Sequence, residues 1–196
     1  MRINKRLIVD DPATYRAARR VLEFQLFDVA RRLPSKAVAK LRETPIWLER
    51  NEPHHPCAVY HLDVENLKLL GMNPDKARGV EISNADTYVA WTREHPSLLL
   101  HELAHAYHDR VVTDGRANAE ILTAFARAKE VGSYDHVLSA KGRIGPAYAT
   151  TDALEFFAEA SEAYFGVNNF YPFVAAELRL HDPETFDLLT KLWGVE

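Results

Sequence analysis

The chain of 196 residues has a single cysteine, Cys57, so no disulfide can form within it and a reducing compartment is favoured. It lacks any apolar run of the ~18 residues that span a membrane. Its first residues also lack the apolar core of a secretory signal. Its net charge of −4 argues against a surface for nucleic acid or anionic lipid. We therefore expect a cytoplasmic protein that binds neither nucleic acid nor membrane, with a secreted mature form as the alternative.

The composition is that of a globular protein, with 47% hydrophobic and 27% charged residues. The length suits one domain with a sound core, and no repeat, low-complexity tract or linker divides the chain. We predict a single domain, 1–196. Its expected parts are an N-terminal helical segment (1–43), a core that carries the candidate catalytic site (44–166) and C-terminal helices (167–196).

The most informative motif is H-E-x-x-H, formed by His101, Glu102 and His105. Its surroundings, 96–112, begin with a proline that suits a first helical turn, and their apolar residues predict a helix. On a helix the two histidines lie one turn apart on the same face, with Cβ atoms about 5–6 Å apart. Such a pair can share one Zn²⁺ at about 2.0–2.1 Å. Glu102 can then face a metal-bound water as general base.

A catalytic zinc site needs a third protein ligand and an open position for water. His108 is a poor candidate because, on the same helix face, it would lie nearly in line with the other two histidines. Glu155, Glu159 and Glu162 form a stripe at i, i+4 and i+7 of a later predicted helix. Alone, this stripe indicates a solvated acidic face. Beside a zinc helix, it predicts Glu155 as the third ligand, Glu159 as a carboxylate that supports a ligand, and Glu162 in solvent.

Periodicity, capping residues and turn residues predict a mostly helical α+β fold, with a small mixed sheet beside the motif helix. The other expected helices are 10–32, a shorter one to 41, 64–71, 119–131, 154–165, 172–180 and one ending near 193. The expected strands are 44–49, 57–62, 79–83 and 87–91, the last two joined at 84–86. An edge strand of this last pair would hold an extended peptide by main-chain hydrogen bonds. His54, His55, Cys57 and His61 are interpreted as loop or core residues rather than a second metal site.

Two segments together carry a resemblance to a known group of enzymes. HELAHAYHD (101–109) and the stretch 148–165, with its E-F-F-A-E sequence, resemble the catalytic domain of anthrax lethal factor and the Mlc titration factor family of zinc peptidases. The similarity covers residues 96–165 and does not extend into the first ninety residues. It implies a zincin fold, with H-E-x-x-H on one helix and a glutamate ligand on a later one.

The resemblance also implies a role for individual residues. The implied zinc ligands are His101, His105 and Glu155, and the implied general base is Glu102. It implies further that the Tyr148 hydroxyl stabilises the transition state and that Asp109 orients a ligand imidazole. Glu159 is implied to be a carboxylate that supports the ligands without binding the metal.

The expected function is that of a zinc metallopeptidase with one Zn²⁺ per chain, acting on a peptide or protein substrate. The alternative is a zinc-containing binding protein that sequesters a partner, because the Mlc titration factor family is associated with sequestering a repressor. Catalysis requires Glu102 and an exchangeable water, whereas sequestration requires neither. Cys57 or the N-terminal helices could regulate access by covering the cleft.

Overall fold

The structure is a computed structural model that describes residues 1–195. Its α-helices are α1 (Lys5–Asp10), α2 (Pro12–Arg32), α3 (Ser35–Leu41), α4 (Val64–Leu69), α5 (Ala85–Trp91), α6 (Leu98–Arg110), α7 (Ala119–Val131), α8 (Ala153–Phe165), α9 (Ala175–His181) and α10 (Pro183–Trp193). Its strands are β1 (Arg2–Ile3), β2 (Ile46–Leu48), β3 (Ala58–Tyr60), β4 (Val80–Ile82), β5 (Val137–Leu138) and β6 (Ile144–Gly145). Short 3₁₀ turns cover Pro74–Lys76, Gly115–Ala117 and Tyr148–Thr150. None of the helices in the described range is long and apolar enough to cross a membrane.

The main sheet has four short strands in the order β1-β2-β4-β3. β1 and β2 are parallel, as are β2 and β4, whereas β3 runs antiparallel to β4. The predicted α+β class with a small mixed sheet is confirmed. β3 pairs with β4 only, so β3 is an edge strand, and it packs beside the motif helix α6.

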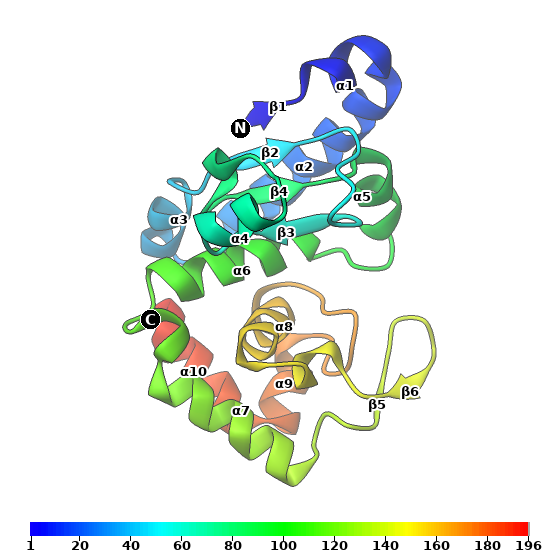
Figure 1. Cartoon of the computed structure of the whole chain (residues 1–196). Coiled ribbons are helices and arrows are strands. Elements are labelled where there is room, and N and C mark those ends of the chain that lie inside the picture. The colour runs from blue at the N-terminus through cyan, green and yellow to red at the C-terminus, as the bar shows by residue number, and fades with distance from the viewer. Residues whose placement is uncertain (196) are drawn as a thin grey trace.

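Helix α6 lies in the middle of the molecule (Figure 1). The main sheet and α1–α5 lie on one side of it, and α7–α10 lie on the other. Aromatic stacking connects α6, α8 and α10. Trp193 of α10 stacks on Tyr107 of α6, with 3.9 Å between ring centroids, and on Phe157 of α8, with 5.9 Å. This packing fixes α6 and α8 relative to each other, and these are the two helices that carry the candidate site.

The predicted strand at 87–91 is wrong, because these residues belong to helix α5. The β-branched and aromatic residues there suggested a strand, but Asn84 caps the helix by accepting a hydrogen bond from the Thr87 backbone N–H at 2.9 Å. The buried Tyr88 of α5 then packs against α2 and donates a hydrogen bond to Gln25. As a result β4 is a central strand, and the edge beside α6 is β3 rather than the predicted pair.

Two smaller expectations also differ from the structure. The N-terminal segment is not wholly helical, since β1 joins the main sheet. The helix expected from Pro172 begins only at Ala175. Gly166 suits the position after a helix, where glycine commonly adopts a positive φ, but it ends α8 with a negative φ of −135°. The glycine is needed for space, because a Cβ there would lie 2.3 Å from the Ser97 hydroxyl oxygen.

Candidate metal centre

Helix α6 is buried on nearly all sides because the sheet covers one side of it and α8 the other. His101 and Glu102 are each only 6% exposed. Helix α8 faces them, and its N-cap is Asp152, whose carboxylate accepts hydrogen bonds from the backbone N–H groups of Leu154 and Glu155. This cap sets Glu155 in the first turn of α8, opposite the motif histidines.

Three of the predicted ligand atoms meet in space. The Nε2 atom of His101 lies 2.9 Å from Oε2 of Glu155 and 3.1 Å from Nε2 of His105. The Nε2 atom of His105 lies 3.4 Å from the same Glu155 oxygen. A tetrahedral zinc with bonds of about 2.05 Å holds its ligand atoms roughly 3.3 Å apart. The residues therefore fit a zinc ion bound by two imidazoles and one carboxylate, with a fourth position open.

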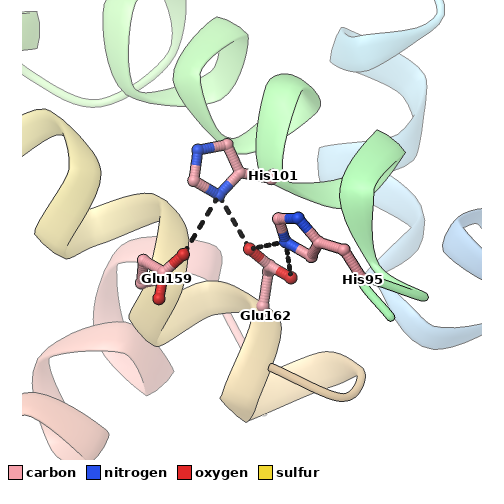
Figure 2. A group of neighbouring side chains, drawn as sticks. All are labelled: His95, His101, Glu159 and Glu162. Atoms are coloured by element: carbon pink, nitrogen blue, oxygen red, sulfur yellow. Dashed lines mark hydrogen bonds and ion pairs between the residues drawn. The ribbon is translucent and has the colours of Figure 1, made fainter. Parts of the chain in front are cut away.

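The other ring nitrogen of His101 contacts a residue that the sequence analysis placed in solvent. Figure 2 shows Glu162 between His101 and His95. Oε1 of Glu162 accepts a hydrogen bond from Nδ1 of His101 at 2.7 Å, and both its oxygens lie within 2.9 Å of His95 Nε2. Glu162 is fully buried, so the prediction of a solvated Glu162 is wrong. Helix α6 and the turn before it pack against this side of α8, which helical spacing alone does not reveal.

Glu159 lies near His101, but it is not the carboxylate nearest to that ring. Its Oε1 is 3.8 Å from His101 Nδ1, beyond hydrogen-bond distance, and the residue is 1% exposed. Burial, and then the negative charge of Glu162, raise the pKa of Glu159 well above its usual range. Glu162 shows the opposite shift, because His95 and His101 outweigh the effect of burial and lower its pKa. Of this pair, Glu162 is the one that carries the negative charge.

The pKa of His101 is affected by two neighbouring carboxylates, those of Glu155 and Glu162. Burial by itself lowers the pKa of His101, but hydrogen bonds from its ring to Glu155 and Glu162 outweigh this and raise it well above the ordinary value. Each ring nitrogen thus faces a carboxylate, and a zinc ion at Nε2 would take the place of any proton there.

A cavity of about 540 Å³ opens over the three ligand atoms, and both Glu102 and Tyr148 line it. The Glu102 carboxylate makes no hydrogen bond to any of the described residues, so it can interact with a molecule in the cavity. The Tyr148 hydroxyl donates a long hydrogen bond of 3.4 Å to Glu155. Burial and the charge of Glu155 raise the pKa of Tyr148, so its hydroxyl keeps its proton at neutral pH.

Asp109 does not orient a ligand imidazole in this structure. Its carboxylate accepts a hydrogen bond from Tyr60 at 3.0 Å, and the guanidinium groups of Arg78 and Arg116 lie 4.0 Å from it. The position four residues after His105 turns the side chain toward β3 rather than back to the motif. The carboxylate that contacts a motif histidine is Glu162, at His101.

The residues set aside in the sequence analysis form no metal group within the described part of the chain. His61 pairs with buried Glu81 at 2.7 Å. Cys57 is buried, and its pKa is raised to about 12, first by burial and then by the charge of Glu102, so its thiol keeps its proton at neutral pH. No residue of the N-terminal segment 1–43 lines the cavity, so these helices do not cover it.

His95 is the site residue that the sequence analysis missed. It lies six residues before His101, ahead of the helix, where neither helical spacing nor the motif points to it. Its hydrogen bonds to Glu162 join positions 67 residues apart in the sequence. The signal available in the sequence was a histidine next to Pro96, at the turn that leads into the motif helix.

Comparison of this chain with models of known protein families, with curated proteins and with solved structures found no match.

Proposed function

We propose that this chain is a zinc-dependent metallopeptidase with a zincin-like fold. The observation that carries the proposal is the convergence of His101 Nε2, His105 Nε2 and Glu155 Oε2 beneath the cavity that Glu102 and Tyr148 line. A structural zinc site is normally closed by four protein ligands, whereas a catalytic site keeps one position open. Three ligand atoms below an open cavity match the catalytic kind.

The surroundings of the cavity support an extended peptide as the substrate. The edge strand β3 contributes Ala58, Val59 and Tyr60 to the cavity wall, and its unpaired edge can add a peptide as a further strand. A second cavity of about 490 Å³ shares the walls formed by Trp91 and Phe170. Together the two cavities provide room for several residues of a peptide chain.

The residues of the chain divide the chemistry of hydrolysis between them. When bound, zinc supplies a Lewis acid that polarises the peptide carbonyl and lowers the pKa of a water toward ~7. Glu102 accepts a proton from the attacking water as the oxygen of that water bonds to the carbonyl carbon. Glu102 then delivers that proton to the nitrogen of the leaving amine as the C–N bond breaks. The Tyr148 hydroxyl donates a hydrogen bond to the oxygen on which negative charge develops.

The proposal is tested by zinc analysis and chelation of the purified chain. We expect about one zinc per chain, with cleavage of a mixed peptide library that stops on chelation and returns on adding Zn²⁺ but not Mg²⁺. Cleavage that is unaffected by chelation, or no zinc under metal-replete conditions, contradicts the proposal. Zinc without any cleavage favours the alternative of a protein that sequesters its partner.

Replacing Tyr148 with phenylalanine removes one hydroxyl from the cavity and leaves the three metal ligands in place. We expect kcat to fall about 10²–10³-fold, as for loss of one donor to an oxyanion, with zinc content unchanged. Peptide cleavage and zinc content are measured beside Tyr15→Phe, a control on helix α2. An unchanged kcat in Tyr148→Phe would show that this hydroxyl does not take part in the reaction.

A further inference from the structure

Behind the first ligand lies a chain of hydrogen bonds that joins three elements. His101 of α6 donates through Nδ1 to Glu162 of α8, and Glu162 also accepts from His95, in the turn before α6 (Figure 2). The His101 ring therefore lies between two glutamates of α8, with Nε2 near Glu155 and Nδ1 near Glu162. One ring is held at both ends by carboxylates of a single helix.

Glu162 is buried, so its contacts with His95 and His101 are needed to stabilise its charge. Its side chain is 0% exposed, and within the described residues no lysine or arginine pairs with it. A buried carboxylate is costly unless it is hydrogen-bonded and its charge is compensated. His95 and His101 supply the hydrogen bonds that Glu162 receives. Glu162 is thus fixed in place by His95 and is directed at His101.

We propose that Glu162, held by His95, is the positioning residue of the metal centre. By accepting the Nδ1–H of His101, Glu162 selects the tautomer in which Nε2 presents its lone pair to the ion. The charge of Glu162 also makes the imidazole more basic, and so a stronger electron-pair donor to the metal. This inference rests on the zinc site proposed above. It gives Glu162 the part that the sequence analysis assigned to Glu159 and Asp109.

The geometry separates Glu162 from its neighbour Glu159. Glu159 stands 3.8 Å from His101 Nδ1, against 2.7 Å for Glu162, and both Glu159 oxygens have no hydrogen-bond partner among the described residues. A carboxyl that makes no hydrogen bond to the ring cannot set its tautomer. Replacing Glu159 with glutamine is therefore expected to change zinc affinity much less than the same change at Glu162.

A second cation is the competing explanation of the same cluster. His95, His101, Glu159 and Glu162 offer four ligand atoms within 4.8 Å of one another. An ion there would require His101 to bridge two metals through both ring nitrogens, with the loss of both ring protons. His101 Nδ1 and His95 Nε2 already make short hydrogen bonds to Glu162, so one zinc and a positioning carboxylate is the simpler arrangement.

The decisive variant is Glu162→Gln, which keeps the shape of the side chain and an oxygen acceptor but removes the charge. Its matched control is Glu94→Gln, which removes the same charge from an exposed residue next to His95. His95→Phe removes the donor that holds Glu162, whereas the amide of His95→Gln can still donate. Zinc affinity is measured by competition with a chelating indicator, the Co²⁺ form is examined by visible absorption, and the fold is checked by circular dichroism.

We expect Glu162→Gln to bind zinc about 10–100-fold more weakly than the wild type and to shift the Co²⁺ d–d bands. His95→Phe should move both readouts in the same direction, His95→Gln should lie closer to wild type, and Glu94→Gln should match it. Wild-type zinc binding with no difference between Glu162→Gln and Glu94→Gln overturns this inference alone. Two ions in the wild type and one in Glu162→Gln overturn it in favour of the second cation site. No zinc binding by the wild type overturns the proposed function itself.

Discussion

Replacing Glu102 with glutamine is expected to lower the rate of peptide hydrolysis about 10²–10⁴-fold while zinc stays bound. The amide has nearly the same shape but cannot accept the proton of the attacking water. The three ligand atoms come from other side chains, so the metal site should survive the change. The measurement pairs kcat on a cleaved library peptide with zinc content by mass spectrometry.

The control for this variant is Glu43→Gln, an exposed residue outside the cavity. It should keep both zinc and activity. If Glu102→Gln remained as active as this control, Glu102 would not be the base and the mechanism above would be wrong. A loss of zinc together with activity would instead assign Glu102 a part in holding the metal.

Removal of either His105 or Glu155 is expected to abolish stable zinc binding. Each variant, His105→Ala or Glu155→Ala, leaves two protein ligands where a catalytic zinc needs three. Their side chains are 12% and 18% exposed and line the cavity, so truncation should leave the core packing intact. We expect zinc to fall from about one per chain to near zero in both variants after dialysis against a weak chelator.

Two exposed residues provide matched controls for these truncations. His136→Ala and Glu130→Ala remove the same side chains outside the cavity and should keep zinc. Zinc retained in Glu155→Ala would assign the third ligand to another group. Glu159 is poorly placed for that part, because its carboxyl faces Nδ1 of His101 rather than Nε2. Retention would therefore contradict the geometry of the site as a whole.

These predictions share one structural cause, the fixed relation between α6 and α8. Two of the proposed ligands come from α6, the third comes from α8, and Trp193 stacks on one aromatic ring from each helix. Ligands that lie on rigid, packed elements keep the separation that a metal requires. The same packing buries Glu162 against His101, so a carboxylate contacts the proposed ligand on the side away from the cavity.

The amino-acid sequence by itself determined the elements that carry the site. A motif with four-residue spacing places His101 and His105 on one face of a helix, and Asp152 caps the helix that carries Glu155. Both signals are local, so they can be recognised without knowing the fold. The central helices and three of the four predicted strands could be predicted from such patterns, and the structure confirmed them.

The tertiary structure alone decided which groups surround these ligands. Glu162 and His101 are 61 residues apart, and Glu162 and His95 are 67 apart, so no local pattern links them. The stripe on α8 looks solvated until another helix covers it, and residues 87–91 look like a strand until Tyr88 packs against α2. Spacing along the chain sets which face of a helix a residue lies on, whereas packing between distant segments determines whether that face meets water, a carboxylate or a metal ligand.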